Sequence, residues 1–424
     1  MNISRSAKIV ALTSSLVILP AAVPSPARTT EGGPIKVALL APTSGSAAAA
    51  GHDMVAGWQL YWKEHDNKVA GRTVQTTVYD TASNAAHALD QARNAVEQDG
   101  AQMIVGPYLA NEGLAVAPYG VQHRIPMFFP TVSADDLSQR QASPYVIKVA
   151  GSTSSLPTHP AGEWAHEQGY RKIVTLANSY AFGYENAGGF AQTFTQRGGK
   201  IVDQLWAPLG TADYSPFISR VQAAAPDAVF VEMVGADAVH FLQQWSALGL
   251  KSKIPLIANE TTTDQSNIRS IAPEIVEGII SFGHFAEGRD APATRSFIEK
   301  YGKAEGVLPS YVATSLYTAA LWIAQAVEKV HGNTADAGTL LRAVRDIKLA
   351  DSSFGPMELD QYGAPVENIY VRKVVATTGE AAKYAKTWNI VVKTYPHVSQ
   401  FWTWKPSDYL KQPVYSPSYQ GYVK

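Results

Sequence analysis

Few residues in this chain have the types and spacing that catalysis requires. His166 and Glu167 begin the pattern in which two histidines one helical turn apart bind zinc, but Tyr170 stands where the second histidine should be. Asp135 and Asp136 could supply two carboxyls for acid–base chemistry, but neighbouring side chains point apart, as in a turn or a helix cap. The sequence therefore offers no clear pair of groups for hydrolysis or metal binding.

Motifs for cofactors and nucleophiles are also missing from the sequence. No glycine triplet of dinucleotide-binding spacing follows a predicted strand, and there is neither a Walker loop nor a Gly-x-Ser-x-Gly elbow. With 0 Cys, the chain has no thiolate nucleophile and no disulfide. We therefore expect a protein that is not an enzyme and needs no cofactor, with an unrecognised hydrolase as the alternative.

The N-terminal residues have the composition of an export signal. Arg5 and Lys8 precede an apolar stretch over residues 9–23, and the small residues Ser25-Pro26-Ala27 follow it. The apolar stretch is too short to span a bilayer, so we expect a signal peptide over residues 1–27 and a mature protein in the periplasm. The formal net charge of -1 gives no general attraction to nucleic acid.

Residues 35–67 predict a strand, a loop and a helix in succession. The apolar run from Ile35 to Leu40 is typical of a buried strand, and small residues follow it from Pro42 onward. In open α/β sheets, ligands bind at loops that leave the carboxyl ends of parallel strands. This loop carries no charge before His52, so it offers a surface for a small molecule and no reactive group.

The same alternation of strand and helix continues along the chain and then restarts. One series ends near Phe129, and a second occupies residues 172–258, with a small polar segment over residues 150–155 between them. A mature chain of about 400 residues exceeds what one hydrophobic core usually supports. We therefore predict an α/β fold with two doubly wound, parallel-sheet lobes.

Several segments, taken together and in order, resemble one known family. They include IKVALLAPTSG, AVEQDGAQMIVGPYLANEGLAVAP, RIPMFFPTVSADDL, YRKIVTLANSYAFGYENAGGF and GPMELDQYG. The family comprises the extracytoplasmic solute-binding proteins of branched-chain-amino-acid-type ABC importers, with the type I periplasmic binding fold. The resemblance implies a monomer that captures a small-molecule solute between its lobes and delivers it to an ABC permease in the inner membrane.

The resemblance also implies a three-crossing hinge between the lobes. The first lobe would hold residues 34–151 and 284–354, and the second would hold residues 152–283 and 355–395. The aromatic C-terminal tail, residues 396–424, would pack on one lobe. A ligand that contacts both lobes would favour their closed arrangement.

Residues matched to the family's binding site lie on loops of both lobes. They are Tyr108, Ala110, Asn111, Val132, Ser133, Thr153, Phe182, Glu232 and Glu260. Ala110 replaces a hydroxyl residue that contacts the ligand carboxylate, although backbone N–H groups at the following helix start can still bind an anion. Ser133 keeps a second hydroxyl, Thr153 replaces an acidic residue, and Phe182 matches an aromatic. Glu260 matches the carboxylate that pairs with a ligand ammonium group.

Departures from the family pattern bear on the ligand. Ala47 to Ala50 widen the first loop where family members often carry a large side chain, which favours a bulkier ligand. We expect an aromatic carboxylate or an amino acid, with an amide or urea-like solute as the next candidate. Tyr108 and Phe182 could instead be core aromatics, and Glu232 a solvated charge. A ligand-sensing receptor of the same fold is the alternative to transport.

Overall fold

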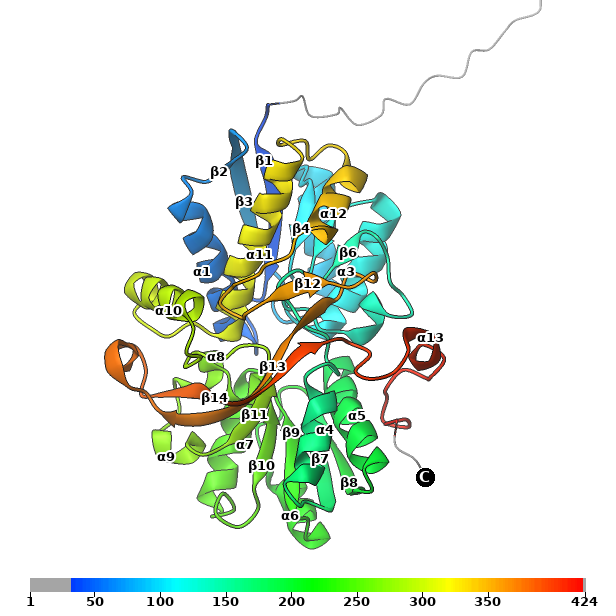
Figure 1. Cartoon of the computed structure of the whole chain (residues 1–424), viewed down its shortest axis with the longest axis vertical. Helices are drawn as coiled ribbons and strands as arrows, with labels where there is room; N and C mark the ends of the chain where they lie inside the picture. The colour runs from blue at the N-terminus through cyan, green and yellow to red at the C-terminus, as the bar shows by residue number, and fades with distance from the viewer. Residues whose placement is uncertain (1–31, 422–424) are drawn as a thin grey trace, which may run out of the picture.

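The computed structural model describes residues 32–421, which form two α/β lobes, one above the other in Figure 1. Each lobe is built around one sheet whose central strands run parallel. The α/β class and the two parallel-dominated sheets predicted from the sequence are confirmed. The predicted signal peptide lies outside the described residues.

The first lobe contains a six-stranded sheet with the order β2-β3-β1-β4-β5-β6. Its strands are β1 (Ile35–Ala41), β2 (Lys68–Val69), β3 (Arg72–Asp80), β4 (Met103–Val105), β5 (Met127–Phe128) and β6 (Val146–Ile147). Its helices are α1 (Ala48–Glu64), α2 (Ala85–Arg93), α3 (Ala110–His123), α10 (Pro292–Glu305), α11 (Tyr311–Lys329) and α12 (Ala337–Arg345). A π-helical turn, η1 (Asn94–Gln98), extends α2, and a 3-10 turn, η2 (Asp135–Ser138), follows β5.

The second lobe contains an eight-stranded sheet with the order β12-β13-β11-β10-β9-β7-β8, and β14 pairs with β13. Its strands are β7 (Lys172–Asn178), β8 (Lys200–Ala207), β9 (Ala228–Glu232), β10 (Leu256–Asn259), β11 (Ile280–Gly283), β12 (Met357–Leu359), β13 (Pro365–Ala376) and β14 (Thr387–Val398). Its helices are α4 (Thr158–Glu167), α5 (Ala181–Gln196), α6 (Ser215–Ala224), α7 (Ala236–Ala247), α8 (Gln265–Ile268), α9 (Pro273–Val276) and α13 (Pro406–Tyr409), with 3-10 turns η3 (Thr261–Thr263) and η4 (Gly379–Lys383).

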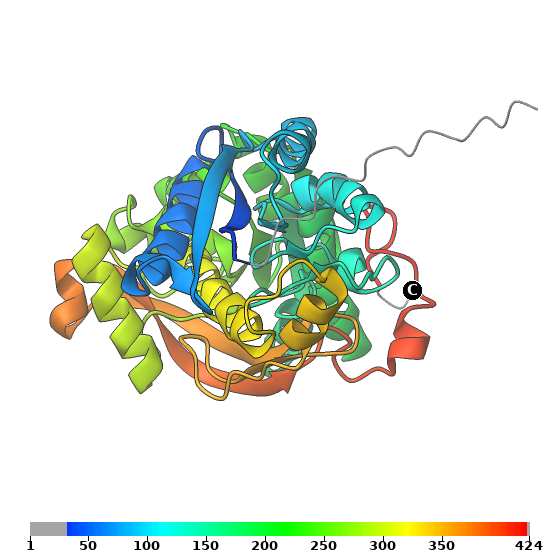
Figure 2. The same ribbon diagram turned by 90° about the horizontal axis from the view of Figure 1, so that it is seen from above.

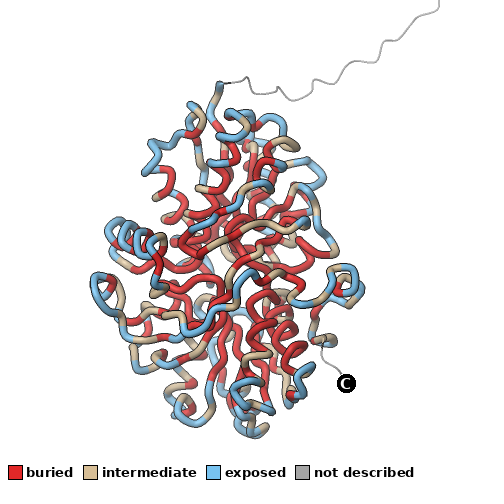
Figure 3. The backbone as a smooth tube through the Cα atoms, in the orientation of Figure 1, coloured by how far each residue is buried: buried red, intermediate tan, exposed pale blue. Residues whose placement is uncertain are grey.

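Apolar runs in the sequence form the buried strands of both sheets. Leu39 of β1 lies between Val78 of β3 and Val105 of β4, and it is fully buried because helices cover both faces of the sheet. Figure 3 shows the same buried interior in each lobe. Burial of a side chain of this size contributes roughly 1.5–3 kcal/mol. The strands are therefore the rigid base from which the loops project.

Local signals place the helices as the sequence predicted. The side chain of Asn84 accepts a hydrogen bond from the backbone N–H of His87 and caps α2, and Ser310 caps α11 through the N–H of Ala313. Helix α11 packs along α1 although the two are far apart in sequence, as Figure 2 shows from above. Within residues 32–421, none of the helices has both the length and the apolar character that a membrane span requires.

The β13–β14 ribbon is a feature that the sequence did not predict in full. Strand β14 pairs antiparallel with β13 from Thr387 to Val398, and the two strands cross the junction between the lobes in Figure 1. The middle of β14 faces solvent, with Val392 half exposed. Because little of this strand is buried, its sequence lacks the alternation that marks a strand.

Candidate ligand-binding cleft

A narrow cleft lies between the lobes where loops from both sheets converge. It is lined by Tyr108, Leu109, Ala110, Thr131, Ser133, Tyr180, Phe182, Val234, Thr261 and Tyr311, which leave a cavity of only about 10 Å³ between them. Most of these residues follow the carboxyl ends of β4, β5, β7, β9 and β10, the edge where open α/β sheets bind ligands. None of the lining side chains in this described part of the chain is charged.

Aromatic side chains form much of the cleft wall. Tyr108, Tyr180 and Tyr311 are all buried, and the hydroxyls of Tyr108 and Tyr311 lie 3.4 Å apart. Burial raises the pKa of each of these three phenols, so they remain protonated hydrogen-bond donors at neutral pH. The ring of Phe182 lies 6.0 Å from that of Tyr180. Flat rings with polar edges suit a planar ligand that carries oxygen atoms.

The first lobe brings hydroxyl and backbone donors to the cleft. Helix α3 begins at Ala110, and the carboxylate of Glu112 accepts hydrogen bonds from the backbone N–H groups of Tyr108 (3.3 Å) and Leu109 (2.9 Å). The first N–H groups of the helix itself have no intrahelical acceptor, which suits an anion. The Ser133 hydroxyl makes only a long bond, 3.4 Å, to the Thr131 carbonyl, so it can turn towards a ligand.

Five of the nine predicted contact residues do not line the cleft, and three of them are Val132, Thr153 and Asn111. Val132 is fully buried and packs against Gly113 of α3, where no side chain would fit. The side chain of Thr153 is also buried, and its hydroxyl has no hydrogen-bond partner within residues 32–421. Asn111 lies in the first turn of α3, one residue beyond the lining Ala110. The resemblance to the family identified the loops that form the cleft, but it did not show in which direction each side chain points.

Glu232 is buried behind the cleft wall. It ends β9, and its Oε2 accepts a hydrogen bond from the backbone N–H of Asn178 at 3.0 Å, while Oε1 has no partner among the described residues. Burial raises the pKa of this carboxyl to about 8, so it is mostly protonated at neutral pH. The alternative of a solvated charge at the strand end is therefore wrong.

Glu260 is already paired within the protein and does not line the cleft. Its carboxylate contacts the Arg372 guanidinium at 3.0 Å and the His284 ring at 2.5 Å, and it accepts the backbone N–H of Phe285 at 2.9 Å. Burial opposes ionisation, but the charges of His284 and Arg372 outweigh it and hold the pKa of Glu260 below its usual value. The structure thus corrects the expectation that this carboxylate is open to a ligand ammonium group.

Four lining residues with polar side chains were absent from the sequence prediction, and one of them, Thr131, lies two residues before the predicted Ser133. Tyr180 precedes α5, Thr261 begins the turn after β10, and Tyr311 is the first residue of α11. Tyr180 is two residues from the predicted Phe182, so the same loop signal could have found it. Tyr311 reaches the cleft from a helix that belonged to neither predicted series of strands, and no local signal in the sequence marks it.

Direct contacts hold the two lobes close together around the cleft. Asp53 of α1 and Arg269, which follows α8, form a two-point ion pair with distances of 3.0 and 3.1 Å. Asp264 of the second lobe accepts the backbone N–H of Tyr311 at 2.8 Å. These contacts, and the small space in the cleft, describe a closed arrangement of the lobes.

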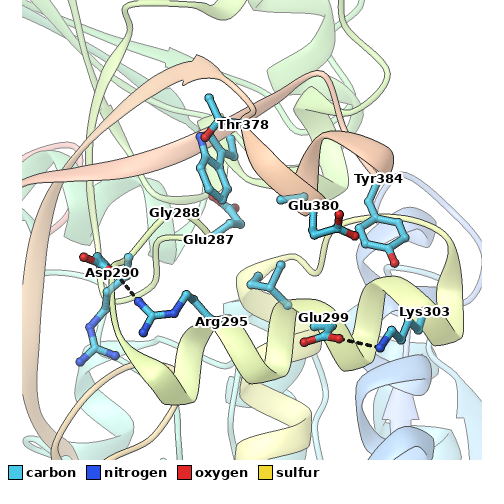
Figure 4. A pocket seen from close by; sticks show the side chains of 13 residues that line it. Glu287, Gly288, Asp290, Arg295, Glu299, Lys303, Thr378, Glu380 and Tyr384 are labelled. Carbon is cyan, nitrogen blue, oxygen red and sulfur yellow. Dashed lines mark hydrogen bonds and ion pairs between the residues drawn. The ribbon is translucent and has the colours of Figure 1, made fainter.

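A larger hollow lies away from the cleft, between α10 and the turn that joins β13 to β14 (Figure 4). Four of its charged residues form two ion pairs: Arg295 with Asp290, and Lys303 with Glu299. The hollow is open to solvent, and of the described loops at the carboxyl ends of the parallel strands it is lined by the one after β11 alone. Size alone therefore does not make it the ligand site. Within residues 32–421, no cluster of His, Asp and Glu side chains is arranged to hold a metal ion.

Comparison with known proteins identifies the family. The model of the family described as periplasmic binding protein matches residues 34–381. The chain belongs to this family. It is 28% identical over 346 residues to the Leu/Ile/Val-binding protein homolog 6 of Brucella melitensis, a match that covers 80% of this chain and 87% of that protein. The resemblance to the binding proteins of branched-chain-amino-acid-type ABC importers is thereby confirmed.

Two solved structures of periplasmic binding proteins extend the comparison. An ABC transporter substrate-binding protein from Sphaerobacter thermophilus is 30% identical, with a TM-score of 0.78 over 86% of this chain and 99% of that chain. A solute-binding protein of an ABC transporter from Rhodopseudomonas palustris BisB5, in complex with 3,4-dihydroxy benzoic acid, is 27% identical, with a TM-score of 0.80 over 86% of this chain and 98% of that chain. Both share the two-lobed fold described above.

Proposed function

We propose that this periplasmic binding protein captures an aromatic carboxylate that has no ammonium group. The observation that carries the proposal is the neutral cleft, which offers phenol, hydroxyl and backbone N–H donors and no charged side chain among its described lining residues. A ligand ammonium needs an anionic partner when it is desolvated. Glu260, matched to that role, is instead bound to Arg372 and His284.

The donors in the cleft suit the two parts of such a ligand. A carboxylate fits the start of α3 near Ala110 and the hydroxyl of Ser133, because helix N-termini and hydroxyls bind anions without a counter-charge. The ring would lie among Tyr108, Phe182 and Tyr180. The solved relative bound to 3,4-dihydroxy benzoic acid supports this ligand class.

The same proposal covers location and partners. The protein would reach the periplasm through the predicted signal peptide, act as a monomer without catalysis, and pass its ligand to an ABC permease. Closure over the ligand would present both lobes to the permease at once. Nucleic acid has no role in this scheme, and the formal net charge of -1 agrees with that.

A thermal-shift screen tests the proposal. The protein is unfolded and refolded to remove any bound ligand, then heated with aromatic carboxylates, aromatic amino acids, aliphatic amino acids or amides. A ligand at 100 times its Kd adds about 2.7 kcal/mol to the free energy of unfolding. We expect the aromatic carboxylates to raise the melting temperature most, whereas stabilisation by amino acids alone would overturn the proposal.

A further inference from the structure

The segment that follows β14, residues 399–421, runs along the side of both lobes beside α4 and α5 (Figure 1). We call it the strap. The family model ends at residue 381, so the strap lies outside the matched part of the chain. The sequence predicted that this segment packs on one lobe, whereas its hydrogen bonds reach elements of both.

On the first lobe, the strap is held by the segment around η2. The Arg140 guanidinium donates to the Gln412 carbonyl from Nη2 at 2.6 Å and from Nε at 3.0 Å. Gln400 exchanges two hydrogen bonds with Ser138, one from the Ser138 hydroxyl at 3.1 Å and one to the Ser138 carbonyl at 3.0 Å. Ser138 and Gln400 are both buried, so these contacts are protected from water.

On the second lobe, Tyr415 anchors the strap. Its ring covers Gly188 of α5, where any side chain would collide with it. Its hydroxyl donates to the Gln192 side chain and lies 3.3 Å from Nε2 of His159 in α4. The indole N–H of Trp402 adds a bond to Glu163 at 3.2 Å.

One residue of the strap bonds to both lobes at once. The carbonyl of Gln412 accepts from Arg140 of the first lobe, while its side-chain oxygen accepts from Nε2 of Gln192 in the second lobe at 3.0 Å. Relative movement of the lobes must therefore break one of these bonds or stretch the strap.

The strap also lies beside the crossing that leads to the cleft. The hydroxyls of Tyr409 and Tyr415 in the strap are 3.3 Å apart, and both side chains are buried. At the crossing, the backbone N–H of Ser154 donates to the Ser133 carbonyl at 2.8 Å. Ser133 lines the cleft, and the strap contacts Ser138 and Arg140 a few residues later in the same segment of the first lobe.

From these contacts we infer that the strap stabilises the closed arrangement of the lobes and thereby slows ligand release. The inference rests on the proposed function, because it concerns the affinity of the same cleft. A tie that is formed only when the lobes are closed shifts their equilibrium by its own differential free energy. Both anchors are required, since a strap that is free at one end does not join the lobes.

Interlobe distance in the absence of ligand gives the first test. The chain has 0 Cys, so Gln122→Cys in the first lobe and Ser252→Cys in the second allow a specific pair of fluorescent labels on exposed positions. Arg140→Ala removes the guanidinium hydrogen bonds of the first-lobe anchor, and Tyr415→Phe removes the hydroxyl of the second-lobe anchor. Asp136→Asn is the matched control, because it removes the Arg140–Asp136 ion pair, 2.8 Å, and leaves the strap in place.

We expect either strap variant to lower energy transfer and the double variant to lower it further, because each substitution removes only part of one anchor, whereas Asp136→Asn should leave it unchanged. Dissociation of benzoate should become at least about fivefold faster in the same variants. Unchanged energy transfer with a lower melting temperature would show a purely structural segment and overturn the inference. Because the distance measurement needs no ligand, it decides the inference even if benzoate does not bind and the proposed function fails.

Discussion

The cleft and the crossing between the lobes at Gly283 and His284 contain different kinds of polar group. The cleft presents hydroxyls and phenols and, among its described lining residues, no charge. The crossing at Gly283 and His284 gathers charge: Glu260, His284 and Arg372 are all buried, and the carboxylate of Glu260 is bonded to both of the others. The two regions are neighbours, but the cleft presents its donors to the space between the lobes, whereas at the crossing only Nε2 of His284 lacks a partner among the described residues.

The charged groups at the crossing stabilise the fold, whereas the neutral groups of the cleft are available to bind a ligand. A buried ion pair repays its desolvation only when its geometry is good and its other atoms are bonded, and Arg372 meets this with bonds to Ser281, Thr263 and the Phe285 carbonyl. The cleft must release its ligand, so weaker neutral donors suit it. Substitutions should therefore affect stability at the crossing and affinity in the cleft.

The largest expected effect is on stability at the crossing. Arg372→Met removes the guanidinium and leaves the Glu260 carboxylate buried without its main partner, which should cost about 3–5 kcal/mol of the free energy of unfolding. Urea denaturation followed by circular dichroism measures this. Lys373→Met, one residue away on the exposed side of β13, is the matched control and should stay within about 0.5 kcal/mol of the parent. Equal losses of unfolding free energy in Arg372→Met and Lys373→Met would contradict the stabilising role of the charged groups at the crossing.

The next effect is on affinity in the cleft. Ser133→Ala removes a hydroxyl expected to bond to the ligand carboxylate, at a cost of about 1.5–3 kcal/mol of binding, or roughly 10- to 100-fold in Kd. Titration calorimetry with benzoate gives the value, and the free energy of unfolding without ligand should change little. Ser219→Ala, on the exposed surface of α6, is the control. A Kd unaffected by Ser133→Ala would remove this residue from the site.

The buried carboxyl behind the cleft should make stability depend on pH. The pKa of Glu232 is raised to about 8 in the folded protein, so the folded state binds a proton that the unfolded state releases near pH 4.5. Stability should therefore fall as the pH rises from 6 to 8.5. Melting temperatures across that range, compared with those of Glu232→Gln, isolate the contribution, since the amide does not titrate. An identical slope in the variant would show that other groups cause it.

The smallest effect concerns the wall of the cleft. The hydroxyls of Tyr108 and Tyr311 are 3.4 Å apart, which is long for a hydrogen bond between oxygens. Tyr311→Phe should therefore change the free energy of unfolding by about 0.5 kcal/mol or less. Benzoate should bind with a Kd within about threefold of the parent, whereas a larger loss would mean that the ligand bonds directly to this phenol.

Much of the fold was predictable because it depends on local patterns. The apolar run at residues 35–40 is readable from a short window of sequence, and it forms β1 as predicted. The long strand β14 was not fully predictable, since its exposed middle has no apolar face.

The site was predictable at the level of loops but not of side-chain direction. Tyr108, Ala110, Ser133 and Phe182 line the cleft because their loops end parallel strands. Glu260 failed as a ligand partner because Arg372, 112 residues later in the chain, reaches it from an antiparallel strand. An arginine within the apolar strand around Tyr370 was the only local sign of a buried ion pair.

The most direct test of the central claim is calorimetric titration of the refolded protein with benzoate and with phenylalanine, a carboxylate that also carries an ammonium group. The neutral cleft predicts that benzoate binds and that phenylalanine binds at least about tenfold more weakly, because its ammonium group would be desolvated without a partner. Tighter binding of phenylalanine, with an affinity lost in Glu260→Gln, would contradict the account and return Glu260 to the ligand site.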